Sequence, residues 1–243
     1  MTEQGEMEMA KPTVGLIRQR LDRCKNLPII EDTSGLALLE FAFTAPVMLL
    51  IGLGGMETAN LAIAHLQVSQ IAMLVADNAS RARESIDEAD IREIFTGADI
   101  TGDAIDFSVN ARVILSNLED NGLSGSDKGQ WIRWQRCYGG NTSFSSSYGN
   151  ENDGKNDSSL AGGIGPTGKK IAATGSTGVN FAEVVYAYQP LVSDRFFGTT
   201  VIRYESAFVA RERDDHALKN AGAIPENQLW KCNVYGTIDN PPS

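Results

Sequence analysis

The sequence is poor in the residues that hold metal ions. It contains only two histidines and three cysteines in 243 residues, and no two of the cysteines lie close together. A typical zinc site takes four such ligands, usually supplied as closely spaced pairs. We therefore expect no metal site.

Basic residues are also scarce. Lys and Arg total 21 against 31 Asp and Glu, which gives a formal net charge of −10 and an isoelectric point near 4.7. An acidic chain is repelled by phosphate backbones, so nucleic acid is not expected as a partner. The hydrophobic share of 42% suits one folded domain of ordinary size plus an additional segment.

Motifs for catalysis or cofactor binding are lacking. The segment GIGPTGKK, Gly163 to Lys170, has the spacing of a phosphate-binding loop, but Lys170 replaces the hydroxyl residue and no apolar strand precedes the segment. No serine lies in the Gly-x-Ser-x-Gly pattern of a nucleophile elbow. His65 is expected on a helix and His216 in a charged surface stretch. We expect no enzymatic activity, no cofactor and no small-molecule substrate, and keep a membrane-anchored enzyme as the last alternative.

One long apolar run stands out from this polar background. Leu36 to Met56 has no basic side chain and a single acid, Glu40. As a helix it would be about 31 Å long, which matches the hydrocarbon core of a bilayer. The alternative is a buried core helix, but such helices rarely stay apolar on every side over this length. We predict a transmembrane helix at 36–56, kinked or loosened at Pro46.

The residues before this run are polar and carry both signs of charge. Four basic residues between Arg18 and Lys25 favour retention of this end in the cytoplasm. An ordinary secretory signal would place its basic residues directly before a short apolar core, which is not the pattern here. We predict a cytoplasmic leader at 1–35, which places everything after residue 56 outside the cytoplasm.

The helical pattern continues beyond the run. Residues 57–84 contain neither proline nor glycine, and apolar residues recur on one face at Leu61, Val68, Ile71 and Val75. One helix of about 45–50 residues is predicted from Leu36 to about Arg83. Its second part, 57–85, would continue outside the membrane and needs a partner surface for its apolar face.

Four strands are predicted in the remaining part, 86–243. They share alternating apolar residues or a concentration of β-branched and aromatic side chains, and span 107–116, 130–138, 181–192 and 200–211. Because no long helix separates these strands, we expect an antiparallel sheet packed on the long helix. The predicted fold class is α+β.

Two further segments are interpreted by composition. Ile86–Phe95 is predicted as a short helix with Asp87 as its N-cap, broken by Gly97 and Gly102. Residues 139–180 are rich in Gly, Ser, Asn, Thr and Asp. We predict a flexible loop there, either a large surface loop or a partly disordered segment.

The three cysteines are divided by the apolar run. If the run spans a membrane, Cys24 stays in the cytoplasm, and Cys137 and Cys232 lie outside it, where disulfides persist. One disulfide between Cys137 and Cys232 is the prediction. Two separate buried thiols are the alternative.

The start of the apolar run carries a recognisable pattern. Gly35 precedes the run, Glu40 is the fifth residue after this glycine, and Phe41 follows directly. The segment GLALLEF resembles the processing motif of type IV prepilins. The resemblance implies that a membrane aspartyl protease, the prepilin peptidase, cuts between Gly35 and Leu36. It also implies that Glu40 pairs with the new N-terminal amine of a neighbouring subunit, since two buried opposite charges are tolerable only together.

Within that group, residues 35–79 are similar to the TadE/TadG-like minor pilins of the tight-adherence (Tad) pilus system. The similarity is carried by Glu40-Phe41-Ala42, by Pro46 and by a second acid near the end of the apolar helix, Glu57. The family has a pilin-like fold, in which a long N-terminal helix packs on the sheet.

The resemblance implies a minor pilin or pseudopilin that serves assembly of a Tad-type pilus in adhesion and surface attachment. The implied partners are membrane lipid, the prepilin peptidase and other pilin subunits. The implied location is the bacterial inner membrane, with a single pass, a cytoplasmic N-terminus and an extracytoplasmic C-terminal domain; entry into the pilus is left open. The alternative is an uncleaved single-pass membrane protein whose outer domain binds a ligand or acts as an adhesin.

Overall fold

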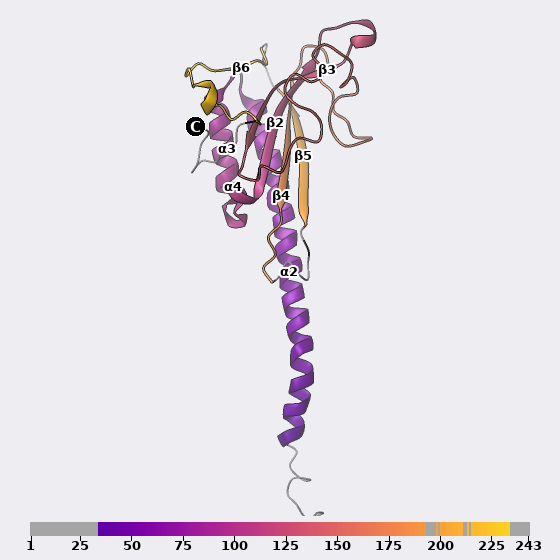
Figure 1. The fold of residues 1–243 in the computed structure, drawn as a ribbon, viewed down its shortest axis with the longest axis vertical. Helices are drawn as coiled ribbons and strands as arrows, with labels where there is room; N and C mark the ends of the chain where they lie inside the picture. Colours follow the sequence, from indigo (N-terminus) through magenta and orange to yellow (C-terminus); the bar gives the residue numbers. More distant parts are fainter. Residues whose placement is uncertain (1–33, 193–197, 199, 211–212, 214, 234–243) are drawn as a thin grey trace, which may run out of the picture. The chain divides into compact units, whose positions relative to one another are not determined.

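The computed structural model describes residues 34–192, 198, 200–210, 213 and 215–233 (Figure 1). The predicted leader lies outside the described residues except for its last two positions. The chain divides into two compact units, Met1–Gly55 and Met56–Ser243. The second unit combines helices with an antiparallel sheet, so the predicted α+β class is confirmed.

The first described element is helix α2, Ser34–Arg81, which is 48 residues long. The prediction of one helix from Leu36 to about Arg83 is confirmed to within about two residues at each end. Pro46 lies inside the helix. Proline lacks the N–H that would bond to the carbonyl four residues earlier, so one helical hydrogen bond is missing there.

The sheet of the second unit has four antiparallel strands in the order β3–β2–β4–β5. The strands are β2 Ala111–Asp120, β3 Gln130–Tyr138, β4 Val179–Ala187 and β5 Val201–Val209. The central strands β2 and β4 are buried over most of their length, on both faces, because each face of the sheet is covered. Four antiparallel strands were predicted, and this is confirmed.

The first strand starts later than predicted. The alternating pattern from residue 107 predicted a strand, but Phe107–Asn110 form the short helix α4. Asp106 has a φ of 48°, and its carbonyl accepts the N–H groups of Val109 and Asn110 at 3.2 and 3.1 Å. These bonds close a helical turn, which local alternation does not reveal.

Helix α2 and helix α3 cover one face of the sheet (Figure 1). The residues of α2 that are buried here recur at helical spacing: Ala64, Val68, Ile71, Ala72, Val75, Ala76 and Ala79. They pack with apolar side chains of β2 and β4, among them Val113, Leu115 and Val184. The second part of α2 therefore has the partner surface that its amphipathic pattern requires.

Helix α3, Glu88–Gly102, follows the short strand β1, Ile86–Asp87. Asp87 is the N-cap, as predicted, and forms a capping box with Asp90. The predicted break at Gly97 is wrong, because α3 runs on to Gly102. At Gly102 an added Cβ would lie 2.3 Å from the Cβ of Phe107, so this close approach requires glycine.

Residues 139–178 cover the opposite face of the sheet. Tyr148, Leu160, Ile164 and Ile171 of this segment pack with apolar side chains of the strands, including Phe181. The segment thus has one of the two predicted forms, a surface loop, but its packing on the sheet was not predicted.

A buried carboxylate fastens this loop to the sheet. Glu183 of β4 is 1% exposed; it accepts the N–H of Ser147 and forms an ion pair with Arg203 of β5. Burial raises the pKa of Glu183. One loop segment and two strands are therefore held by a single side chain.

Short elements complete the second unit. Strand β6, Leu218–Lys219, pairs in parallel with β1. The described residues also form the short 3-10 helices η1 Asp103–Ile105, η2 Gly125–Asp127 and η3 Glu226–Gln228.

Candidate functional site

The predicted processing position lies in the first turn of α2. Leu36 is 65% exposed. An added Cβ at Gly35 would meet no atom within 4 Å beyond its chain neighbours and its own helix backbone. Both residues of the bond are exposed in this arrangement. Cleavage at this bond stays a prediction.

The predicted assembly residues lie one turn further along. Glu40 and Phe41 are both exposed, and no residue that the structure describes forms a hydrogen bond or ion pair with the side chain of Glu40. Residues four apart in a helix lie on the same face. The side chains of Leu36 and Glu40 therefore share one face of α2. The pairing role also stays a prediction.

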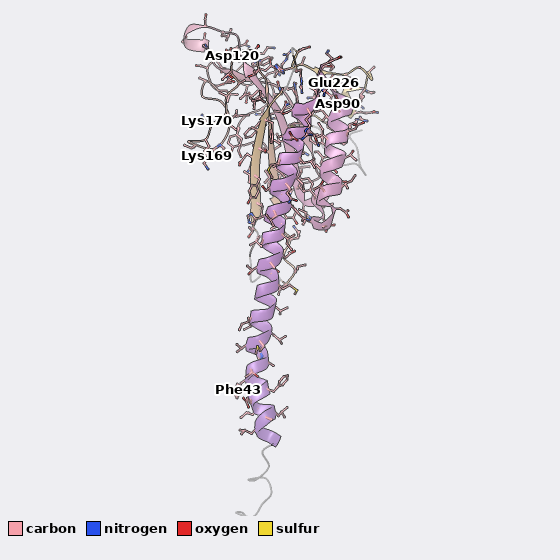
Figure 2. All side chains as sticks on the ribbon, turned by 180° about the vertical axis from the view of Figure 1, so that it is seen from behind. Phe43, Asp90, Asp120, Lys169, Lys170 and Glu226 are labelled. Carbon is pink, nitrogen blue, oxygen red and sulfur yellow. A yellow bond between two sulfur atoms is a disulfide. The ribbon has the colours of Figure 1, made fainter. Side chains whose placement is uncertain are left out.

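The apolar run has no cover within the described chain. Its large side chains are 54–72% exposed from Leu36 to Ile51, and Phe43, the most exposed of them, projects from the helix (Figure 2). By length and composition α2 is the one described helix that is able to cross a membrane. A single apolar helix near the N-terminus fits a single-pass membrane protein.

Glu57, the first residue after the predicted span, is buried. Its side chain is 1% exposed, and it accepts a hydrogen bond from the Tyr188 hydroxyl at 2.5 Å. The second carboxylate oxygen accepts the N–H groups of Leu191 and Val192 at 2.9 and 3.1 Å. Asn60, one turn along α2, donates to the Tyr188 hydroxyl oxygen at 2.8 Å. We call these five residues the Glu57 clamp.

The clamp satisfies a carboxylate that would otherwise be costly to bury. Desolvation of a charged group is tolerable only when hydrogen bonds replace the lost water, and here three donors do so. Burial and the bond to Glu57 raise the pKa of Tyr188 to about 12, so its hydroxyl remains a donor at physiological pH. The clamp ties the turn after β4 to the start of the outer part of α2.

Two further polar contacts set the register between α2 and β5. Nδ1 of His65 lies 3.3 Å from the Tyr204 hydroxyl, and the Ser80 hydroxyl donates to the Phe208 carbonyl at 3.1 Å. Residue numbers rise together along both elements, so β5 runs in the same direction as α2. His65 is therefore engaged with the sheet and is not placed as a catalytic base.

The C-terminal end of α2 is closed by an arginine. The Arg213 guanidinium donates to the carbonyl oxygens of Ala79 at 2.7 Å and Ala82 at 3.1 Å. A cation at this end also complements the partial negative charge of the helix terminus. Burial lowers the pKa of Arg213, but arginine stays charged at any physiological pH.

The structure contains the disulfide between Cys137 and Cys232, which joins residues 95 apart. Cys137 also donates its N–H to the Trp230 carbonyl at 2.8 Å. The Trp230 ring stacks on Phe95 of α3 and lies against Tyr138 of β3. The end of the described chain is thereby fastened over α3 and the edge of the sheet.

The segment GIGPTGKK is not built as a phosphate site. Ile164 and Ile171 form an isolated antiparallel bridge, and no helix follows the glycine-rich turn. Lys169 and Lys170 project outward from this turn (Figure 2). Among the described residues no group of three or more His, Cys, Asp or Glu side chains is placed to hold a metal ion.

His216 is buried rather than on the surface, which corrects the sequence-based placement. It is 4% exposed, with Nε2 3.0 Å from the Ser176 carbonyl oxygen. Its own carbonyl accepts the Trp134 indole N–H. These contacts give His216 a packing role between the loop and the sheet.

The Glu57 clamp is the functional feature that sequence reasoning missed. The sequence marked Glu57 only as a second acid near the end of the apolar helix. Its main partner, Tyr188, is 131 residues away, and a contact at that separation leaves no local pattern. The run YAYQPLV, with its proline after a strand, was the one signal that a turn lies there.

The comparisons with known proteins agree with the pattern at the start of α2. The family model described as TadE-like protein matches residues 35–81. Neither the curated proteins nor the solved structures contain a match to this chain. The matched range coincides with α2 almost residue for residue. The chain thus carries a TadE-like segment, formed by helix α2, and the resemblance inferred from Gly35, Glu40 and Glu57 is confirmed over that segment.

Proposed function

We propose that this protein is a minor pilin, or pseudopilin, needed for assembly of a Tad-type pilus in surface attachment. The observation that carries the proposal is the correspondence between the family match and α2. The matched segment is a helix whose apolar first part is uncovered and whose second part packs on the sheet. Such a helix serves anchoring and packing between subunits rather than catalysis.

The outer part of α2 also presents a surface for other subunits. Ile63, Leu66 and Met73 lie on the side turned away from the sheet and are 47–62% exposed. Their spacing of three and seven residues is that of a coiled-coil seam. A neighbouring helix that packs along this seam would cover apolar side chains that the domain itself leaves in water.

In this proposal the leader is removed between Gly35 and Leu36. Cleavage gives Leu36 an α-amino group, whose ordinary pKa of about 8 leaves it mostly protonated at neutral pH. The exposed Glu40 carboxylate of a neighbouring subunit would pair with this amine in a low-dielectric environment. The domain after residue 56 would lie outside the cytoplasm, where the disulfide between Cys137 and Cys232 persists.

The test separates processing from assembly. Glu40→Ala should leave cleavage intact and sharply reduce the number of pili counted on cells by electron microscopy. Thr44→Ala, an exposed polar change one turn along the same helix, should leave both unchanged. Gly35→Leu should block cleavage. Normal piliation in Glu40→Ala cells would contradict the pairing role.

A further inference from the structure

The turn after β4 is fixed to the helix at the place where the proposed membrane span ends. Met56 is the last residue of that span, and Glu57 follows it directly. The Glu57 carboxylate holds the N–H groups of Leu191 and Val192. The turn therefore lies at the same depth relative to a membrane as Glu57 does.

The same end of the domain exposes large apolar side chains. Leu191 is 62% exposed, Val201 at the start of β5 is 52% exposed, and Met56 is 51% exposed. Val201 pairs with Ala187 at the end of β4, so it begins β5 where the turn leaves β4. We call Met56, Leu191 and Val201 the apolar rim.

The described residues around this rim carry no charge. Residues 184–192 and 200–202 include no Asp, Glu, Lys or Arg. The nearby carboxylate of Glu57 is enclosed by its donors rather than exposed to solvent. Asp194 and Arg195 lie in the connecting segment 193–199, most of which is outside the described residues. The described part of this edge is apolar, which suits an environment that is poorer in water than the bulk solvent.

The distance of the apolar rim from the end of the span indicates that this environment is the bilayer interface. The polar interface of a bilayer adds roughly 5–8 Å on each side of the hydrocarbon core, whereas one helical residue advances about 1.5 Å. Glu57 is one residue past the span, and Leu191 is bonded to it. The rim therefore falls within the thickness of the interface.

We propose that the apolar rim inserts into the outer interface of the bilayer, so that the domain has a second membrane contact besides the helix. This inference rests on the membrane span of the proposed function. The Glu57 clamp supports this contact, because it holds the turn at this depth and encloses the Glu57 carboxylate. The contact would limit tilting of the domain about the end of the span before assembly.

The experiment places a nitroxide label at single cysteines of the full chain in vesicles of phosphatidylcholine and phosphatidylglycerol at a high lipid-to-protein ratio. Cys24→Ser removes the free thiol, and the disulfide between Cys137 and Cys232 is left oxidised. Leu191→Cys and Val201→Cys report on the rim. Leu50→Cys reports on the span, and Leu123→Cys, beside η2 and 38% exposed before substitution, is the reference in water. Collision of each label with oxygen and with a water-soluble nickel chelate gives its depth.

The labels at 191 and 201 should show a nickel-to-oxygen collision ratio several-fold lower than the label at 123. Adding Leu191→Asp should raise the ratio at 201, and adding Asn121→Asp next to the reference should not. A nickel-to-oxygen collision ratio typical of water at 191 and 201, with a ratio typical of lipid at 50, would contradict insertion of the apolar rim but not the membrane span. A water-like ratio at 50 would overturn the span and the rim together. Low collision rates with both reagents at 191 would show burial against protein and would also overturn the inference.

Discussion

Residues 36–56 and 57–81 belong to one continuous helix, yet their side chains meet different surroundings. No residue of 36–56 is buried, whereas the 57–81 part buries an apolar face and holds Glu57 and Ser80 in polar contacts with the sheet domain. The sheet explains the sequence of the second part. Nothing within the described chain covers the first part, whose length and composition are those of a helix able to cross a membrane.

The family match extends over both parts and ends at the end of the helix. The matched range therefore includes Glu57 and the residues of α2 that are buried against the sheet, as well as the apolar run. Substitutions in the two parts of α2 and in the domain should therefore have different effects on stability.

The largest effect is expected from loss of the disulfide, which should unfold the domain but leave the first part of α2 helical. For a closed loop of 95 residues, chain entropy gives a loss of about 4.7 kcal/mol in the free energy of unfolding of the domain. Cys232→Ser should therefore unfold at much lower denaturant in detergent while residues 36–56 stay helical. It should also abolish the mobility shift between reducing and non-reducing gels, and Cys24→Ser should retain that shift. An unchanged denaturation midpoint would contradict a stabilising bridge.

A core substitution in the second part of α2 should destabilise the domain more than a substitution on the exposed side of the same helix. Ile71 of α2 is fully buried in the core that α2 forms with α3 and the sheet. Ile71→Ala should therefore lower the free energy of unfolding by about 3 kcal/mol. Leu66→Ala, on the exposed side at 62%, should change it by less than about 0.5 kcal/mol in detergent. Chemical denaturation followed by tryptophan fluorescence provides the measurement. Equal effects at the two positions would mean that the sheet does not cover the face assigned to it.

The Glu57 clamp should contribute less than the core. Tyr188→Phe removes one donor from a buried carboxylate, and we expect a loss of about 1–2 kcal/mol. Tyr204→Phe, which loses only the longer contact to His65, is the matched control and should cost less. Hydrogen exchange at the amides of Leu191 and Val192 should also speed up in Tyr188→Phe. If exchange there is unaffected, the turn is not held by the clamp.

The smallest effect concerns alkaline pH. The pKa of Tyr188 and that of Tyr148 are both raised to about 12 against an ordinary value near 10, mainly by burial. A raised pKa means that the folded state favours the protonated hydroxyl. The resulting stability is fully present below pH 10 and is lost as the pH rises from about 10 to 12.

Ultraviolet absorption at the phenolate band follows this titration. In the folded protein, Tyr188 and Tyr148 should ionise late, together with Tyr186, whose pKa burial also raises. Tyr188→Phe and Tyr148→Phe should each reduce the amplitude of this late titration. Tyrosines that all titrate near pH 10 while the domain remains folded would contradict the burial of these hydroxyl groups.

The features that could be predicted from the sequence are those with a local cause. The apolar run and the proline-free stretch after it predicted α2, and Asp87 followed by Asp90 gave a capping box that needs no distant partner. Gly97 was taken as a helix breaker on propensity alone. The packing of α3 against α2 and the sheet outweighs a cost of about 1 kcal/mol for one glycine.

The features that escaped prediction depend on contacts between distant residues. The apolar residues of the loop, such as Tyr148 and Ile171, are scattered without a period, so their packing on the sheet is not visible in the sequence. The Glu57 clamp joins residues more than 130 positions apart. The processing and pairing roles of Gly35 and Glu40 depend on other proteins and are carried by the family resemblance alone.

The central claim is that this chain is a processed pilin subunit, and the mass of its N-terminus tests it most directly. The protein would be purified from the membranes of cells with an active prepilin peptidase, and its intact mass and N-terminal peptide determined by mass spectrometry. We predict loss of residues 1–35 and an N-terminal Leu36. An N-terminus at Met1 or Thr2 would contradict the account and favour an uncleaved membrane protein with an adhesive outer domain.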